Sequence, residues 1–134
     1  MINLSPMLLF AIATGGALGA MSRYMIQQLF ALWFGADFPW GTLVANISGC
    51  LIIGLVIGIW SNSGTEISPE MRAFVTIGFL GAFTTFSAFS LDTITMMQNA
   101  AYLKATLNIV YNLLACLVAT YAGFSIAKVL QPIS

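Results

Sequence analysis

The segment from Gly78 to Ser90 combines residue types that a plain lipid-facing helix does not need. It holds two glycines, four phenylalanines and a run of hydroxyl side chains inside a membrane-length apolar stretch. Glycine costs a helix about 1 kcal/mol relative to alanine, and threonine and serine compete for backbone hydrogen bonds, so we expect the helix to open here. Carbonyls freed inside a bilayer need protein, an ion or water as partner. An ion site is therefore the first hypothesis.

Two phenylalanines of this segment, Phe86 and Phe89, are three residues apart and share a face of a helix. The edge of an aromatic ring is electropositive and its face electronegative, so an anion meets ring edges and a cation prefers ring faces. Such a pair is more often a packing contact than a site. The hydroxyls of Thr85, Ser87 and Ser90, which interleave with the rings, favour a polar pathway.

Polar side chains also occur deep inside other apolar stretches. Asn46 is one of them, and its amide offers donors to an anion or to a neighbouring backbone. Near the C-terminus a fourth-span polar stripe recurs every four residues on one helical face. It consists of Asn108, Asn112, Cys116 and Thr120. The stripe either lines a wet passage or makes hydrogen bonds between helices, and the sequence leaves both open.

The composition is that of a membrane protein. Apolar residues make up 60% of the 134 residues, charged residues only 6%, and there is no histidine. The mean hydropathy is +0.97, whereas globular proteins carry about a quarter charged residues. A net charge of zero argues against a nucleic-acid partner. We expect residues 1–134 to form one transmembrane domain and, without histidine, paired acids or a nucleotide loop, no enzyme.

The few charged residues divide the chain into four apolar stretches, each long enough for the roughly 20 residues that cross a bilayer. Trp40 and Trp60 bracket the second stretch, as interfacial aromatic residues do. The first stretch lacks a basic start and is too long for a signal peptide, so we expect it in the mature protein. The predicted spans are 6–34, 40–60, 69–98 and 102–130.

The positive charges show almost no bias between the two membrane faces. With four spans, Arg72 and Lys128 fall on one face and Lys104 on the other, while Arg23 lies within the first span. The bias of positive charge sets the orientation of a membrane protein. The chain therefore either inserts in both orientations, which allows an antiparallel dimer, or has one fixed orientation with a weak bias.

Small residues and cysteines complete the pattern. Two glycine pairs form ridges for close helix packing, either between chains or within one chain: Gly15 with Gly19, and Gly54 with Gly58. The two cysteines, Cys50 and Cys116, both lie in apolar stretches. They lack the spacing of a disulfide or metal motif, so we expect buried, reduced thiols.

In these features the chain resembles the small dual-topology fluoride channels called Fluc or CrcB. The resemblance extends over essentially the whole chain, with three motifs in the family's order and spacing. They are Gly15-Gly16-Ala17-Leu18-Gly19 followed by Arg23-Tyr24, Gly41-Thr42-Leu43-Val44-Ala45-Asn46, and Gly78-Phe79-Leu80-Gly81 running into Thr84-Thr85-Phe86-Ser87-Ala88-Phe89-Ser90. The resemblance implies an all-α antiparallel homodimer in the bacterial inner membrane, with four spans per subunit and a broken third helix. It also implies passive export of fluoride from the cytoplasm through two pores.

The resemblance further implies roles for single residues. Phe86 and Phe89 match the phenylalanines whose ring edges contact fluoride, and Asn46 matches the pore asparagine that donates to it. Gly81 and Thr84 match the positions whose backbone carbonyls hold a structural sodium ion on the dimer axis. Two carbonyls from each subunit supply oxygen ligands, which suit a hard cation.

Other polar positions also carry implied roles. Ser87, Thr42 and the fourth-span polar stripe, Asn112 included, resemble the polar lining beside the rings. Arg23 matches the arginine of the first span, which either supplies a positive field near a vestibule or forms a structural ion pair.

The chain departs from the family pattern in three places. Ala88 stands where a hydroxyl residue is common, Asp92 where a glutamate is common, and the fourth-span asparagines where serine, tyrosine or histidine is often found. Two other classes of protein compete with the channel. One is a four-span proton-coupled small multidrug exporter, which needs an ionisable acid in mid-membrane, and Asp92 lies toward the end of its span. The other is a structural subunit with no transport of its own.

Overall fold

The computed structural model describes residues 5–64 and 66–130, and within these ranges all regular structure is helical. Four helical stretches are long and apolar enough to cross a membrane. They are Pro6–Phe34, Trp40–Asn62, Pro69–Gln98 and Tyr102–Leu130. The predicted all-α class with four spans is confirmed, and only the end of the second span differs, at Asn62 instead of Trp60.

The first two spans are single helices and the last two are subdivided. The first two are α1 (Pro6–Phe34) and α2 (Trp40–Asn62). The third contains α3 (Pro69–Arg72), the π-helical η1 (Ala73–Leu80), α4 (Gly81–Phe83) and α5 (Phe86–Gln98). The fourth contains α6 (Tyr102–Val110), the π-helical η2 (Tyr111–Ala115) and α7 (Cys116–Leu130). Wide π-helical turns are rare and often lie near functional sites, and the sequence pattern does not indicate them.

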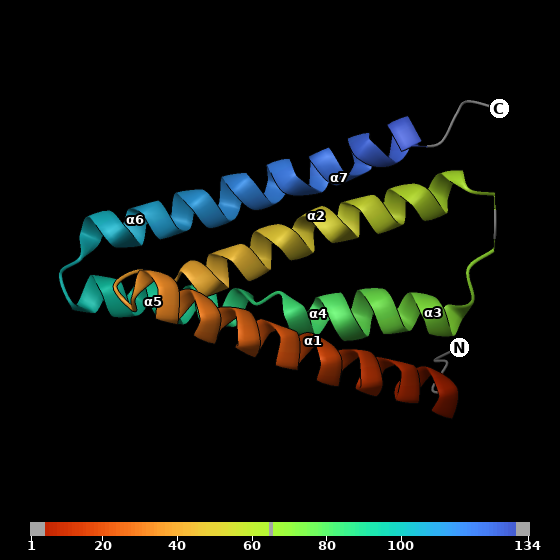
Figure 1. Ribbon diagram of the computed structural model, residues 1–134, viewed down its shortest axis with the longest axis horizontal. Helices are drawn as coiled ribbons and strands as arrows, with labels where there is room; N and C mark the ends of the chain where they lie inside the picture. The colour runs from red at the N-terminus through yellow and green to blue at the C-terminus, as the bar shows by residue number, and fades with distance from the viewer. Residues whose placement is uncertain (1–4, 65, 131–134) are drawn as a thin grey trace.

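The spans run lengthwise in one elongated bundle (Figure 1). α2 lies beside α7, and α1 lies beside η1 and α4. The loop between α2 and α3 is at one end of the bundle. The α1–α2 and α5–α6 connections are at the other end. This topology makes α2 and the fourth span parallel neighbours, which decides which of their polar side chains meet.

The glycine ridges serve packing within the chain. A Cβ atom on Gly15 or Gly19 would collide with backbone atoms of η1, including those of Phe79. A Cβ atom on Gly54 would collide with the carbonyl of Thr120 on α7. Hydrophobicity supplies little drive between helices in a bilayer, so small residues that let backbones approach hold such pairs together.

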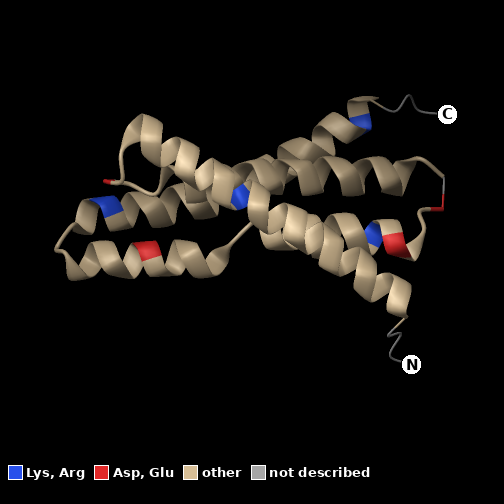
Figure 2. Ribbon diagram, turned by 60° about the horizontal axis from the view of Figure 1, so that its bottom comes forward, with Lys and Arg blue, Asp and Glu red and all other residues tan. Residues whose placement is uncertain are grey.

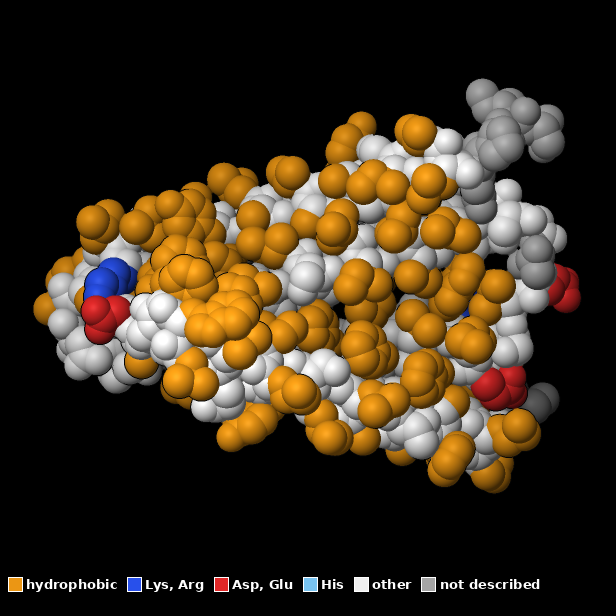
Figure 3. All heavy atoms as spheres, in the orientation of Figure 1, with side chains coloured by type: hydrophobic (Ala, Val, Ile, Leu, Met, Phe, Trp, Pro, Cys, Tyr) orange, Lys and Arg blue, Asp and Glu red, His pale blue; other side chains and the backbone are white. Residues whose placement is uncertain are grey.

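The outer surface of the single chain is apolar over most of its length. Charged residues gather near the ends of the bundle, apart from Arg23, which lies well inside α1 (Figure 2). Hydrophobic side chains cover the face seen between those ends (Figure 3). Leu32, Tyr121 and Val129 are among the many large apolar residues that are exposed. A surface of this kind suits lipid or another apolar chain rather than water.

Candidate functional site

Thr84 and Thr85 have extended backbone angles and separate α4 from α5. The ψ angle of Thr84 is 155°, and Thr85 has φ −153° and ψ 112°. The Thr85 hydroxyl accepts from the N–H of Ala88 at 3.1 Å and so caps the start of α5. Gly81, in contrast, has helical angles. The extended backbone is thus confined to the two β-branched hydroxyl residues of the Gly78 to Ser90 segment, because they favour extended and capping conformations.

Asn46 on α2 holds the backbone of Thr85 from across the bundle. The N–H of Thr85 donates to Oδ1 of Asn46 at 2.7 Å, and Nδ2 of Asn46 donates to the carbonyl of Thr85 at 3.2 Å. The same Nδ2 donates to Oδ1 of Asn112 at 2.9 Å. Asn46 is only 8% exposed, so these bonds satisfy polar groups that would otherwise be buried without partners. One amide therefore pins the extended segment to α2 and to the fourth span.

The network continues into the fourth span and returns to α5. Nδ2 of Asn112 donates to the carbonyl and to Oδ1 of Asn108, both at 3.0 Å. Nδ2 of Asn108 donates to the hydroxyl of Thr93 at 2.9 Å, and that hydroxyl donates to the carbonyl of Phe89 at 2.7 Å. Asn108 is fully buried. Of the two interpretations of the stripe, hydrogen bonding between helices is the one that Asn108 and Asn112 show.

A pocket of about 290 Å³ lies beside this network. Its lining includes Asn46, Asn112, Phe86, Phe89 and Thr84. The rings of Phe86 and Phe89 meet edge to face, with centroids 5.2 Å apart and planes at 63°. Phe89 is buried, whereas Phe86 is 74% exposed on the single chain. The structure thus brings the predicted ring pair and the two predicted amides to one cavity.

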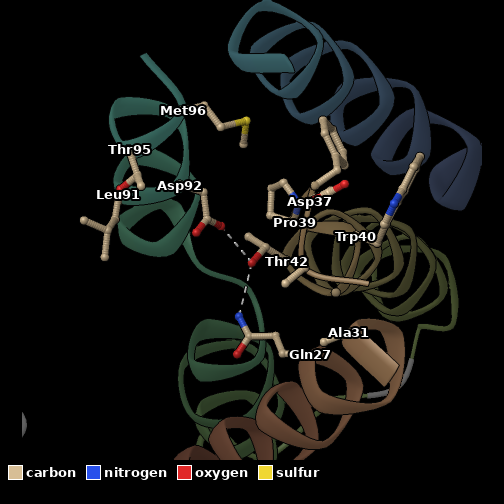
Figure 4. A pocket seen from close by; sticks show the side chains of 13 residues that line it. Gln27, Ala31, Asp37, Pro39, Trp40, Thr42, Leu91, Asp92, Thr95 and Met96 are labelled. Atoms are coloured by element: carbon tan, nitrogen blue, oxygen red, sulfur yellow. Dashed lines mark hydrogen bonds between the residues drawn. The ribbon is translucent and has the colours of Figure 1, made fainter. Parts of the chain in front are cut away.

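Thr42 lies in a different pocket, of about 440 Å³, at the end of the bundle where α1 joins α2. Figure 4 shows its hydroxyl between two side chains from other helices. Nε2 of Gln27 donates to the Thr42 hydroxyl at 3.2 Å, and that hydroxyl donates to Oδ2 of Asp92 at 3.1 Å. Asp37, Trp40 and other residues complete the lining. Thr42 and Asn46 are one turn apart on α2, so the two pockets lie next to one another along that helix.

Ser87 and Arg23 touch the extended segment from other directions. The hydroxyl of Ser87 is 3.1 Å from that of Thr85. Nε of Arg23 on α1 donates to the carbonyl of Ala82, in the last turn before the extended residues, at 3.0 Å. A cation near the C-terminal end of a helix is stabilised by the helix dipole. The contact that Arg23 makes is thus to backbone, which neither a vestibule role nor an ion pair predicts.

The carbonyls of Gly81 and Thr84 lose the amide partners that a continuous helix would give them. The N–H of Thr85, four residues after Gly81, donates to Asn46 instead. The N–H of Ala88, four residues after Thr84, donates to the hydroxyl of Thr85. Both residues line a third pocket, of about 170 Å³. Oxygen atoms diverted from helical bonding suit a hard cation.

The two cysteines lie together, which the sequence interpretation did not anticipate. Both are free and half-buried, as expected for reduced thiols. However, their side chains lie close enough to interact electrostatically, and both line the pocket of Asn46 and Phe89. The expectation of free thiols holds, but the spacing in the sequence does not reveal that the two are neighbours, because the parallel packing of α2 and α7 brings distant positions into register.

The sequence interpretation missed three participants in these networks. Gln27 and Thr93 are polar residues inside predicted spans, and this alone marks them as candidates for interhelical contact. Thr93 also follows Phe89 by four residues, the spacing at which a threonine hydroxyl bonds back to a helical carbonyl. Asp92 stood out as a departure from the family pattern and as the acid of the rival exporter, but its bond to Thr42 was missed because it depends on the α2–α5 packing.

Comparison with known proteins identifies the chain's relatives. The family described as "CrcB-like protein, Camphor Resistance (CrcB)" matches residues 10–124. A protein of Shewanella baltica strain OS185 is 44% identical over 115 residues, which are 86% of this chain and 91% of that protein. A protein of Shewanella halifaxensis is 44% identical over 112 residues, or 84% and 89% of the two chains. A longer protein of Methylococcus capsulatus is 42% identical over 127 residues, 95% of this chain and 54% of its own.

All three relatives are named "Fluoride-specific ion channel FluC". They are ion channels by name, and not enzymes, so the expectation that this chain is not an enzyme is confirmed. The four spans and these relatives together make the chain a multi-pass membrane protein. With the family match covering most of its length and relatives above 40% identity over most of both chains, the protein belongs to the CrcB family.

Proposed function

We propose that this chain is a fluoride-selective channel through which fluoride leaves the cytoplasm down its gradient. The name of its relatives supports the choice of ion. The observation that carries the proposal is the pocket that is lined by the amides of Asn46 and Asn112 and by the rings of Phe86 and Phe89. Amide donors and electropositive ring edges are groups that replace water around an anion.

In this proposal fluoride passes by exchanging its water of hydration for the amide N–H groups and the ring edges. Fluoride is small and strongly hydrated, so a narrow pore must offer several donors at once, while a larger chloride ion fits less well. Both N–H groups of the Asn46 amide are already engaged, with the Thr85 carbonyl and with Asn112. Fluoride therefore takes one of these donors by displacing a protein oxygen. Displacement of Asn112 costs less, because its amide keeps two bonds to Asn108.

The proposed working unit is an antiparallel homodimer with two pores. Phe86, Ser87 and Gly81 are exposed on the single chain although they lie near the middle of the third span. Hydroxyls and opened backbone are not stable against lipid tails, so this face needs a protein partner. The near balance of positive charge permits a second copy in the opposite orientation. Each pore is then closed on its open side by the other subunit.

A sodium ion on the dimer axis fits the oxygen atoms available. The carbonyl oxygens of Gly81 and Thr84 are the proposed ligands, because Asn46 and the Thr85 hydroxyl accept from the backbone N–H groups that would bond these carbonyls in a continuous helix. When bound, such a cation supplies positive charge that satisfies opened backbone from both subunits. Asn46 and Thr85 keep these carbonyls available by holding the extended segment. We place the protein in the bacterial inner membrane, where fluoride leaves the cytoplasm.

The proton-coupled exporter is the rival function, and its acid would be Asp92. That carboxylate accepts from Thr42 in the pocket at the end of the bundle, away from mid-membrane. An exporter of hydrophobic cations needs its acid where substrate and proton compete. The structural subunit has no feature that favours it over a channel.

Purified protein in liposomes separates the three functions. Liposomes loaded with potassium fluoride, with valinomycin to carry the compensating charge, release fluoride to an ion-selective electrode only if a channel is present. Chloride release in parallel gives the selectivity. An exporter instead moves a lipophilic cationic dye when a proton gradient is imposed, and a structural subunit is silent in both assays.

The ring pair gives the sharpest variant test of the proposal. Phe86→Ile and Phe89→Ile remove the ring edges while keeping apolar bulk, so we expect fluoride efflux to fall by about tenfold or more, the loss of roughly one favourable contact per ion. Phe10→Ile is the matched control, since Phe10 is an exposed phenylalanine on α1 away from the pocket. Wild-type rates in both ring variants would remove the rings from the ion's route.

A further inference from the structure

The fourth span and α2 pack as parallel helices in one constant register. Asn46 bonds to Asn112, which lies 66 residues later in the chain. The same separation relates Gly54 to Thr120, whose backbone it packs against, and Gly58 to Phe124, whose Cα would lie 3.4 Å from an added Cβ. Positions four residues apart on one helix thus face positions four residues apart on the other.

Cys50 and Cys116 occupy the one step of this register between the amide pair and the glycine contacts. They have the same separation of 66 residues as Asn46 and Asn112, and their side chains lie close enough to interact electrostatically. They are the only cysteines of the chain, and both are free. Both line the 290 Å³ pocket that also holds Asn46 and Phe89. The fold therefore places two thiols together at the wall of a cavity.

The donor atoms at this position select a soft metal ion. The amide oxygens of the same pocket are already acceptors, since Oδ1 of Asn46 receives the Thr85 amide and Oδ1 of Asn112 receives the Asn46 amide. Among the described residues no group of three or more histidine, cysteine or acidic side chains is available to hold a metal ion. Zinc prefers four ligands, and calcium and magnesium prefer oxygen. Two sulfur atoms alone suit a soft ion that accepts two ligands.

We propose that Cys50 and Cys116 form a binding site for a soft divalent metal ion that takes two sulfur ligands, and that the bound ion obstructs the adjacent pocket. On binding, each thiol gives its proton to water and each sulfur forms one bond to the metal, with no change of oxidation state. Two thiolates and a divalent ion make a neutral complex, which suits a membrane interior. The obstruction depends on the proposed function, whereas the binding does not.

Mercuric ion is the probe for binding. The purified chain in detergent is titrated with mercuric chloride, and the thiols that remain are counted with a maleimide dye. We expect one ion per chain to remove both thiols. In competition with a monothiol such as glutathione, the wild type should hold the ion about 100-fold more tightly than Cys50→Ser or Cys116→Ser, because the second sulfur acts at high effective concentration. Equal retention by the single variants, or one thiol left reactive per bound ion, would overturn the site.

Fluoride efflux tests the obstruction separately. Mercuric ion should slow fluoride efflux from wild-type liposomes by about tenfold, because an ion held between the two thiols blocks a narrow route. A dithiol chelator should remove the metal and restore the efflux. Each variant is compared with its own rate without metal, and Cys50→Ala and Cys116→Ala replace the serine variants if those fold poorly. Two-thiol binding with undiminished efflux would overturn the obstruction. Absence of efflux from wild type without metal would refute the proposed function, and the titration would still decide the site.

Discussion

Replacing Asn46 by leucine tests whether one amide holds the extended segment together. Leucine keeps the branched shape of asparagine and its number of side-chain heavy atoms but makes none of its hydrogen bonds. Three groups lose their partner: the N–H and the carbonyl of Thr85, and Oδ1 of Asn112. Thr85 and Asn112 are 8% and 5% exposed, so water replaces the amide poorly.

The magnitude follows from these three groups. At about 1 kcal/mol or more for each buried group left unpaired, the loss is about 3 kcal/mol. Averages for hydrogen bonds between membrane helices, about 0.6 kcal/mol each, give about 2 kcal/mol. Either figure is a large part of the roughly 5 to 15 kcal/mol that holds a domain folded, yet leaves the protein assembled at low temperature. Because Asn46 is also the proposed hydrogen-bond donor to fluoride, fluoride efflux should be lost together with stability.

Two measurements check the Asn46→Leu variant. Thermal unfolding followed by size exclusion in detergent gives the stability, and the fluoride electrode gives the efflux from liposomes. Asn62→Leu is the matched control, since it makes the same change at an exposed position of α2. Wild-type stability in Asn46→Leu would refute the clamp on Thr85. Reduced stability with unchanged efflux would keep the clamp and remove Asn46 from the ion route.

Three further outcomes follow from other contacts. Arg23→Met loses the bond to the Ala82 carbonyl and should slow fluoride efflux by about tenfold, which corresponds to about 1.5 kcal/mol for a charged hydrogen bond. Arg23→Lys keeps the charge and should recover part of the rate. Equal efflux rates in the wild type and both variants would refute a role for Arg23. Gly54→Ala pushes a Cβ into the Thr120 carbonyl and should lower the stability by about 1 to 3 kcal/mol. Gly16→Ala is the control and should leave the stability unchanged, because the nearest atom to its added Cβ is the Gly78 carbonyl oxygen at 4.0 Å. Equal losses of stability in the two variants would contradict the packing of Gly54 on Thr120. Replacing sodium by N-methylglucamine should lower the unfolding temperature of the assembled protein, because an ion that binds only the folded state stabilises that state. Sodium but not potassium should restore the unfolding temperature. An unfolding temperature that does not depend on sodium would refute the carbonyl site.

The spans were predictable because a bilayer imposes one strong constraint on sequence. A helix that crosses it must be apolar for a fixed length, and the charged residues of this chain are few enough to mark the limits. The single difference, at Asn62, lies where polar residues extend α2 past Trp60 into the loop. The π-helical turns η1 and η2 were not predictable, because they arise from packing in three dimensions and have no sequence signal.

The candidate site was predictable in its residue types and not in its connections. Polar residues inside spans drew attention to Asn46, Asn112 and the phenylalanine pair, and the structure brings these to one pocket. Thr42 was expected beside the rings but lies in the neighbouring pocket with Asp92. Which polar groups meet depends on the register between helices, and a register is a property of packing that no single helix encodes. The pairing of Cys50 with Cys116 was missed for this reason.

In the proposed channel, the register between α2 and the fourth span also links stability to conduction. The Asn46 amide has two N–H groups, and the described contacts use both, one on the backbone of the extended segment and one on the fourth span. A fluoride ion that accepts from this amide must break one of these contacts. If it breaks the bond to Asn112, the fourth span is released while Thr85 stays fixed, because Oδ1 of Asn46 still accepts from Thr85. In the proposed channel, passage of fluoride would then loosen the contact between α2 and the fourth span near Cys50 and Cys116 while the proposed carbonyl site keeps its shape. Faster labelling of these thiols by maleimide in fluoride than in chloride would support that coupling, and equal labelling would place the exchanged bond on the Thr85 side.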